Sequence, residues 1–280
     1  MAEITAAAVA KLREMTGAGM MDCKKALSES NGDVNAAVDI LRKKGAATAT
    51  NKGTREAREG LVARYVAPDG RLGVLVEVNC QTDFVARNDT FKAFADDVAR
   101  RLAVDPKTNF EADRVDMVAK IRENIQIPRH ARMEVATNGM IAAYIHTGGK
   151  VGVLVEVGAA KDSTVAAEEF KQLVKDITLQ IAAGHPFVVS RDQVPADVLA
   201  KEREIATDQV KNKPPQAISK IVEGKLEKFY QTYCLVDQGF VKKNSEVSVK
   251  EHVGSIAKQL GDEISIRRFV RFQVGEATAS

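Results

Sequence analysis

Histidine and cysteine, the residues best able to bind a transition metal, are few and widely spaced in this 280-residue chain. The cysteines show no Cys-x-x-Cys spacing, and no histidine lies at a short ligand spacing from a cysteine or another histidine. The seven residues are His130, His146, His185, His252, Cys23, Cys80 and Cys234. We therefore expect no metal site and three free thiols, which are typical of a cytoplasmic protein.

Glycine-rich segments that could bind a nucleotide are also incomplete. Gly45 is followed five residues later by Thr50, so a phosphate-binding loop is missing. Gly17 and Gly19 lack the third glycine of a dinucleotide fingerprint, since Asp22 takes its place. No Gly-x-Ser-x-Gly elbow supports a hydrolase. We expect no cofactor, no direct nucleotide binding and no catalytic site, although an enzyme whose site assembles from distant residues stays open.

The charge balance gives little support for a nucleic-acid partner. Lys and Arg total 41 against 38 Asp and Glu, and the basic pairs, such as Lys24-Lys25 and Arg267-Arg268, are short and scattered. Tryptophan is absent and only four tyrosines could stack on bases. Nucleic acid is thus an unlikely partner, and an RNA-binding or ribosome-associated scaffold is the alternative that the pI of 8.6 keeps open. No run of 18 apolar residues predicts a membrane span.

An internal repeat must position whatever site the chain has. The segment Gly-Val-Leu-Val-Glu-Val occurs at 73–78 and again at 152–157, a shift of 79 residues. Around each copy, β-branched runs flank a turn, and an amphipathic stretch with apolar residues three and four apart follows. The chain therefore contains two copies of a hairpin followed by a helix.

A second internal similarity indicates an insertion in the second copy. Residues 123–127 and 132–135 resemble 262–266 and 271–274, a shift of 139 rather than 79. The second copy must hold about 60 additional residues. Their apolar stripes (Val194, Val198, Ile205 and Val210, then Ile218, Ile221, Val222, Phe229 and Tyr233), separated by Pro214-Pro215, predict an antiparallel helical hairpin. It either projects as an arm or packs into the core.

The first 45 residues carry three further helical stripes, with Val9, Leu12 and Met15 on the first and Met21 and Leu27 on the second. Residues 46–59 lack apolar periodicity and are interpreted as a linker. The predicted fold is α+β, with antiparallel sheets in a duplicated core. Its predicted parts are a three-helix module plus linker at 1–54, the first repeat at 55–138, the second repeat at 139–189 and 236–280, and the helical insertion at 190–235.

The two repeats differ most sharply just after the matched strand. Thr82-Asp83-Phe84-Val85 in the first copy corresponds to Lys161-Asp162-Ser163-Thr164 in the second, so the aspartate persists and the phenylalanine does not. Either Thr82 or Asp83 caps a helical turn while Phe84 and Val85 enter the core, or Phe84 is presented outward beside a carboxylate. Because duplicated units share what the fold needs, this difference marks a candidate functional site.

Two long segments, 12–27 and 77–87, resemble the signature motifs of bacterial translation elongation factor Ts. The duplicated core, the inserted helical hairpin and the closing segment 266–272 are also similar to that family. The resemblance implies a UBA-like three-helix N-terminal module and a helical hairpin of coiled-coil type. It also implies a partner, elongation factor Tu, whose release of GDP family members accelerate without a catalytic site of their own.

The resemblance also assigns candidate site residues. Thr82, Asp83, Phe84 and Val85 would press against the GTPase near its Mg²⁺ site, with Phe84 wedged between two helices and Asp83 disturbing the groups that hold the ion's water ligands. Further contacts with the partner are implied for positions in the N-terminal module and at the turn of the second hairpin. These are Arg13, Met20, Met21, Lys24 and His146.

Overall fold

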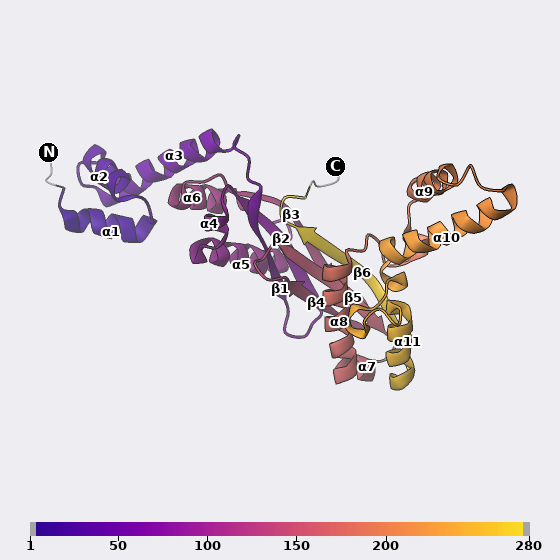
Figure 1. Ribbon diagram of the computed structural model, residues 1–280. Coiled ribbons are helices and arrows are strands. Elements are labelled where there is room, and N and C mark those ends of the chain that lie inside the picture. Colours follow the sequence, from indigo (N-terminus) through magenta and orange to yellow (C-terminus); the bar gives the residue numbers. More distant parts are fainter. Residues whose placement is uncertain (1–3, 277–280) are drawn as a thin grey trace.

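The computed structural model describes residues 4–276, so the first three and last four residues of the predicted parts lie outside the described residues (Figure 1). Within that range the chain combines helices with two three-stranded antiparallel sheets, in the orders β1-β2-β3 and β4-β5-β6. The predicted α+β class is confirmed. None of the helices between residues 4 and 276 has the length and apolar character that crossing a bilayer requires.

Three helices open the chain: α1 (Ala6–Thr16), α2 (Met20–Glu29) and α3 (Val34–Lys52). Gly17 ends α1 in the left-handed conformation, with φ of 66°. Asp33 caps α3 by accepting hydrogen bonds from the backbone N–H groups of Asn35 and Ala36. The helices bury a small apolar cluster of their own, which includes Leu12 and Leu27.

Two expectations for this region were wrong. Met15 and Met21 were placed on apolar stripes, yet both are exposed, and Cys23, Ala26 and Leu27 form the buried face of α2. Residues 46–52 were interpreted as a linker, yet they continue α3. This stretch is helical because Ala49 is buried against the first repeat and α3 packs along α6 (Glu111–Ile121). Small side chains allow that close packing, and they gave no periodic signal.

The repeats match element by element. The first contains β1 (Glu59–Val66), β2 (Leu72–Cys80), α4 (Asp83–Ala86), α5 (Asp89–Val104), α6 and β3 (Gln126–Glu134). The second contains β4 (Gly139–Ile145), β5 (Val151–Ala159), α7 (Asp162–Ala166), α8 (Glu168–Gly184), α11 (Val249–Leu260) and β6 (Ile264–Gln273). The shift is 79 residues up to α5 and α8 and 139 from α6 and α11 onward, as the insertion requires.

The two sheets pack face to face and the helices cover their outer faces. Val62 and Leu75 of one sheet meet Ile141 and Leu154 of the other. On the outer faces, α5 lies on the first sheet and α8 on the second (Figure 1). The central strands β2 and β5 are thus buried on both sides, which explains why their sequence is a nearly continuous apolar run.

Glycine is required where the sheets come closest. A Cβ atom added to Gly73 would lie 2.5 Å from Cγ2 of Ile141, and one added to Gly152 would lie 2.5 Å from Cγ1 of Val62. Gly73 and Gly152 are equivalent in the two repeats, as are Val62 and Ile141. Each sheet therefore approaches the other through the same glycine, and a side chain at either position would force the sheets apart.

The interface between the sheets is reciprocal in its hydrogen bonds as well. The Val62 N–H donates to the Gly149 carbonyl and the Ile141 N–H to the Gly70 carbonyl, each at 2.7 Å. Buried Glu77 and Glu156, also equivalent, accept from Arg129 and from Arg267 and Arg268. Arg129 further donates to the Gln273 carbonyl, and Arg268 to the Glu134 carbonyl. The repeats are related by an approximate twofold axis between the sheets.

The insertion forms α9 (Ala196–Asp208) and α10 (Pro215–Tyr233), which project from the body (Figure 1). Three short 3-10 turns, Arg191–Gln193, Leu235–Asp237 and Val241–Lys243, connect them to the second repeat. The two helices bury a separate apolar cluster containing Ala206, Val210, Val222 and Leu226. Ile205, placed on the buried stripe by its spacing, is exposed, and Ala206 takes its place.

Candidate partner-binding site

The candidate segment forms one short helical turn, α4, between β2 and α5. Thr82 caps it, since its hydroxyl oxygen accepts a hydrogen bond from the Val85 N–H at 3.4 Å. Asn88 then caps α5 by accepting from the Thr90 N–H at 2.8 Å. Two caps six residues apart prevent α4 and α5 from merging into one helix, so the turn stands out at the end of the strand.

The four side chains of the turn have different environments. Phe84 is 80% exposed, whereas Val85 packs against the first core and Ala86 is buried. The expectation that Thr82 caps a helical turn is therefore correct. The expectation that Phe84 and Val85 both enter the core holds for Val85 alone. Asp83 and Arg87 form an ion pair at 2.9 Å, in which the Arg87 side chain is 78% and the Asp83 side chain 44% exposed.

A carboxylate from a distant part of the first repeat holds the strand end in front of this turn. Glu123, between α6 and β3, accepts hydrogen bonds from the N–H groups of Gln81 and Thr82 at 2.9 and 3.0 Å. It also accepts from the Thr82 hydroxyl at 2.7 Å. On the inner side, the Cys80 thiol donates to the Thr82 carbonyl at 3.2 Å. Burial and the nearby Glu123 raise the pKa of Cys80 to about 12, so this thiol keeps its proton.

The equivalent turn of the second repeat presents no large apolar side chain to solvent. At α7 the residue corresponding to Phe84 is Ser163, and the residue corresponding to half-buried Val85 is buried Thr164. The backbone path is shared, because both segments are short helical turns that follow the central strand directly. The exposed ring is thus an addition to a shared frame.

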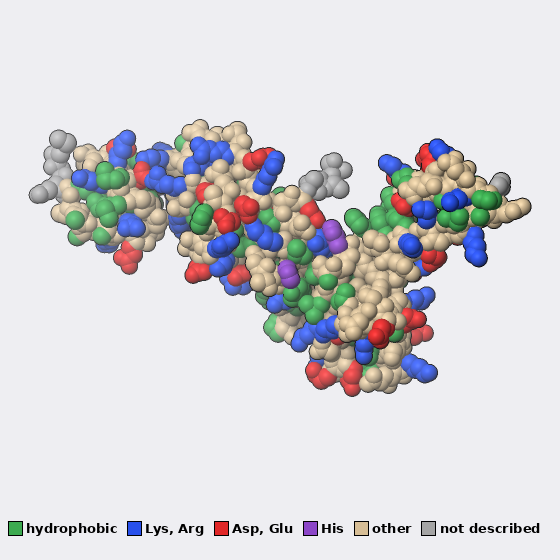
Figure 2. Space-filling view, in the orientation of Figure 1, with side chains coloured by type: hydrophobic (Ala, Val, Ile, Leu, Met, Phe, Trp, Pro, Cys, Tyr) green, Lys and Arg blue, Asp and Glu red, His purple; other side chains and the backbone are tan. Residues whose placement is uncertain are grey.

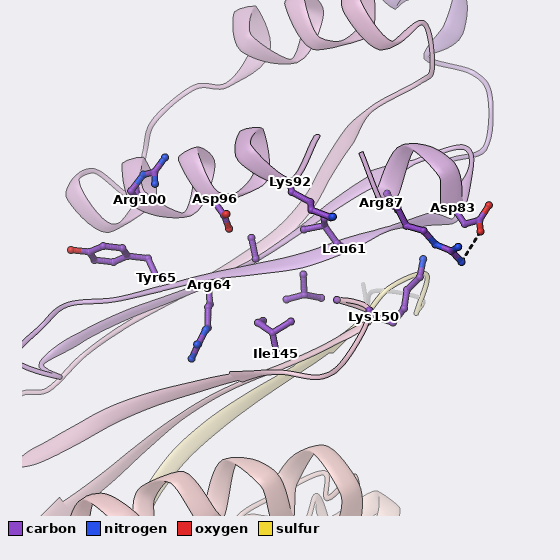
Figure 3. A pocket seen from close by; sticks show the side chains of 15 residues that line it. Leu61, Arg64, Tyr65, Asp83, Arg87, Lys92, Asp96, Arg100, Ile145 and Lys150 are labelled. Atoms are coloured by element: carbon purple, nitrogen blue, oxygen red, sulfur yellow. Dashed lines mark ion pairs between the residues drawn. The ribbon is translucent and has the colours of Figure 1, made fainter. Parts of the chain in front are cut away.

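A groove of about 980 Å³ opens beside the turn (Figure 3). It is lined by residues of α4, α5 and the edge strand β1, and by the turn that connects β4 and β5. Leu61 and Ile145 contribute apolar surface, while Asp83, Arg87 and Lys150 lie together at one end. The turn therefore borders a concave surface large enough to receive part of another protein.

The residues implied for the N-terminal module lie on one surface. Arg13, Met20, Met21 and Lys24 all line an open groove of about 820 Å³ between α1 and α2. Met20 is 58% and Met21 74% exposed, and Figure 2 shows apolar side chains on this part of the surface. Exposed, flexible methionines are typical of surfaces that adapt to a partner.

His146 occupies a third surface. It is exposed, and its Nδ1 atom lies 3.1 Å from the hydroxyl of Tyr144. Both line a smaller groove of about 370 Å³ together with Leu179 and Lys242. The structure thus brings Thr82 to Val85 together in one turn, gathers the four N-terminal residues in one groove, and leaves His146 apart from both.

The described residues show neither a group of metal ligands nor a reactive thiol. Between residues 4 and 276, no three His, Cys, Asp or Glu side chains are grouped so that they could hold a metal ion. Cys23, Cys80 and Cys234 are buried and free. Burial also raises the pKa of Cys234, to about 11. Lys, Arg, Asp and Glu side chains are interspersed on the face shown in Figure 2.

The sequence analysis did not identify Glu123, although the sequence contains a signal that could have done so. The segment 123–127 was recognised as an echo of 262–266, but the resemblance was used only to locate the insertion. Glu123 aligns with Asp262, and Asp262 accepts a hydrogen bond from the N–H of Lys161, the residue equivalent to Thr82. A carboxylate kept at the same place in both repeats was the available signal.

Comparisons with known proteins give a consistent result. A family model described as "Elongation factor TS" matches residues 81–276. Relatives named "Elongation factor Ts" include those of Symbiobacterium thermophilum, 47% identical over 285 residues, and Clostridioides difficile, 45% identical over 293 residues. A third, from Nostoc punctiforme, is 43% identical over 295 residues. Each alignment covers 99% of this chain and 93 or 94% of the relative.

Proposed function

The chain belongs to the elongation factor Ts family of translation elongation factors, and on that premise we propose that it binds elongation factor Tu in its GDP-bound form and accelerates release of the nucleotide. It would do so as an exchange factor without a catalytic site of its own, acting in the cytoplasm. The observation that carries the proposal is the exposure of Phe84 on a capped, hydrogen-bonded turn.

An exposed phenylalanine on a fixed turn suits the role of a wedge. Burying a phenylalanine side chain in a partner contributes about 1.5–3 kcal/mol. Because the turn is already ordered by its caps, little conformational entropy remains to be lost on binding. Phe84 can therefore stabilise a form of the GTPase in which two helices are separated, provided that form exposes an apolar slot.

Asp83 would act beside the ring on the groups around Mg²⁺. The ion and the phosphate-binding loop provide the main electrostatic hold on GDP in such GTPases. The ion pair between Asp83 and Arg87 is exposed, and pairs of this kind contribute little stability, so Asp83 can exchange Arg87 for groups of the partner at small cost. Weakening the hold on Mg²⁺ lowers the affinity for GDP.

Reciprocity makes the complex transient. If this protein lowers the affinity of the GTPase for nucleotide by some factor, nucleotide must lower the affinity of the GTPase for this protein by the same factor. Incoming GTP therefore displaces the exchange factor. The cycle needs no covalent chemistry on either protein surface.

We also propose a division of roles among the predicted parts of the chain. The groove of the N-terminal module, with Arg13, Met20, Met21 and Lys24, would contact the domain of elongation factor Tu that binds the nucleotide. The surface at His146 would contact another domain of that partner. The projecting helices α9 and α10 would be less necessary for exchange than Phe84.

Stopped-flow fluorescence tests the proposal. Elongation factor Tu loaded with fluorescently labelled GDP is mixed with excess unlabelled GDP, with and without this protein. We expect the release rate to rise with the concentration of this protein and then to saturate. Unchanged release, with this protein shown to be folded by circular dichroism, would refute the proposed function.

A further inference from the structure

Residues 122–124 connect three parts of the molecule that are distant in sequence. Arg122 has a positive φ of 64°, its guanidinium pairs with Asp22 of α2, and its carbonyl accepts from the side chain of Lys52 in α3. Asn124 is fully buried and donates to the carbonyl of Arg55, just before β1. Between them, Glu123 holds the strand end in front of α4.

The contacts of Glu123 restrict the exit from β2 at two consecutive residues. One carboxylate oxygen accepts from the N–H groups of both Gln81 and Thr82, and the other accepts from the Thr82 hydroxyl. The Asn124 N–H in turn donates to the Gln81 side chain at 3.2 Å. Since Thr82 also caps α4, the carboxylate fixes the residue from which the orientation of the whole turn is set.

The second repeat shows which part of this arrangement the fold itself requires. Asp262, equivalent to Glu123, accepts from the Lys161 N–H at 3.0 Å. Its side chain is one methylene shorter, and the residue equivalent to Thr82 is a lysine, which has no hydroxyl. The Glu123 carboxylate therefore accepts three hydrogen bonds from residues 81 and 82, whereas the Asp262 carboxylate accepts one from residue 161. The other contacts of the second strand end use main-chain acceptors: the Ala160 N–H donates to the Glu263 carbonyl and the Lys161 side chain to the Gly261 carbonyl. A carboxylate holds the strand end mainly in the repeat that carries the exposed phenylalanine.

We propose that Glu123 is a positioning residue for exchange: by fixing Gln81 and Thr82 it presents Phe84 in the orientation that the GTPase binds. This inference rests on the proposed function and assigns a residue to it. Without the carboxylate, the strand end gains alternative conformations, and only a fraction of molecules present the ring correctly. The apparent affinity falls by that fraction, while the complex, once formed, is the same.

Exchange kinetics separate this role from a merely structural one. With Glu123→Ala, the concentration of this protein that gives half-maximal GDP release should rise about 10-fold, with the maximal rate nearly unchanged. Glu123→Gln keeps an oxygen acceptor at the same place and should recover most of the loss. Asp262→Ala is the matched control, and it should leave the half-maximal concentration unchanged.

A double-mutant cycle provides the second readout. If Glu123 acts through Phe84, the variant Phe84→Ala/Glu123→Ala should release GDP no more slowly than Phe84→Ala alone. The inference would be overturned if Glu123→Ala caused the same relative loss with and without Phe84. It would equally be overturned if Asp262→Ala caused an equal loss, or if Glu123→Gln behaved like Glu123→Ala.

Hydrogen exchange tests the inference without any partner. Peptides covering residues 81–87 should exchange faster in Glu123→Ala than in wild type, while peptides covering 160–166 should not change. Unchanged exchange at 81–87 would overturn the inference. Absence of stimulated GDP release by the wild-type protein would instead refute the proposed function. If Glu123→Ala does not fold, Glu123→Asp, which withdraws the carboxylate by one methylene and leaves the Thr82 cap of α4 in place, provides the same comparison with a smaller expected effect.

Discussion

The turn after β2 and the turn after β5 have nearly the same backbone conformation but present different side chains to solvent. Each follows a central strand, begins with an aspartate and leads into a long helix that covers its sheet. One presents Phe84 to solvent, while the other carries Ser163 at that place. Within one chain, the second copy thus acts as a control for the first. Whatever both share serves the fold, and what only one has is free to serve a partner.

The shared residues should carry the largest effects, and these should be effects on stability. Phe91 and Phe170 are equivalent and fully buried, each between its sheet and its helix. Phe91→Ala and Phe170→Ala should each lower the free energy of unfolding by about 3–5 kcal/mol, since each leaves a cavity. Urea denaturation measures both. A cost below about 1 kcal/mol for either would mean that the two cores are not equivalent.

Removing the unshared residue should have the opposite profile. Phe84→Ala should reduce the efficiency of GDP release about 30-fold, the effect of losing about 2 kcal/mol at a buried contact of an interface. The free energy of unfolding should change by less than about 0.5 kcal/mol, because the ring is exposed in the free protein.

Val104→Ala is the control for Phe84→Ala. Val104 is 87% exposed and ends α5, about 24 Å from the start of that helix. It should change neither GDP release nor stability. If Phe84→Ala unfolded the protein instead, Phe84 would serve the fold rather than a partner.

A smaller effect is expected at a surface that has no copy in either repeat. Met21 lies in the groove of the N-terminal module and is highly exposed. Met21→Ala should weaken association with elongation factor Tu about 5-fold, the effect of losing about 1 kcal/mol, and leave the melting temperature unchanged. Isothermal titration calorimetry with nucleotide-free partner measures it. Unaltered affinity would limit the functional part of the comparison to the turn at Phe84.

The smallest expected effect is a pH dependence of stability that arises in the helices of one repeat and not in those of the other. His252 on α11 stacks on Phe240 at 4.2 Å between ring centroids, and burial lowers its pKa below 6.5. Nearby Asp176 opposes that shift, while Lys242 and Lys243 add to it. The unfolded chain therefore binds this proton more readily, so the contribution to stability is complete above pH 6.5 and is lost as pH falls below it.

The equivalent residue in the first repeat is Asp113, which is ion-paired with Arg101 at 2.8 Å. The acid-dependent loss should therefore come from the second repeat. Between pH 7.5 and 5.5 the melting temperature of wild type should fall more than that of His252→Gln. Equal falls in both proteins would assign the loss to other groups.

The repeat and the divergent turn were visible in the sequence because both depend on direct comparison of two segments of one chain. Single-segment patterns did less well. Met21 and Ile205 fit helical stripes by spacing, but small helices packed on only one side bury a narrow seam, and cysteine and alanine fill it. Residues 46–52 show no periodic pattern of large apolar residues, because this part of α3 packs through small side chains such as that of Ala49.

The orientation of Phe84 could not be predicted from its residue type, since an apolar residue after a capped turn suits the core and the surface equally. The role of Glu123 depends on contacts across 41 and 42 residues of sequence. Those contacts exist because α6 ends beside the end of β2, a fact of the tertiary structure. Only the parallel between Glu123 and Asp262 was visible beforehand.

The reciprocal hydrogen bonds between the sheets have a consequence for the covalent chain itself. Val62 with Gly149 and Ile141 with Gly70 form the kind of self-complementary contact that joins two copies in a symmetric dimer. Here a single peptide segment, 135–138, links the two halves. Proteolytic nicking within it should leave both fragments associated, and the halves expressed as separate polypeptides should reassemble into one particle.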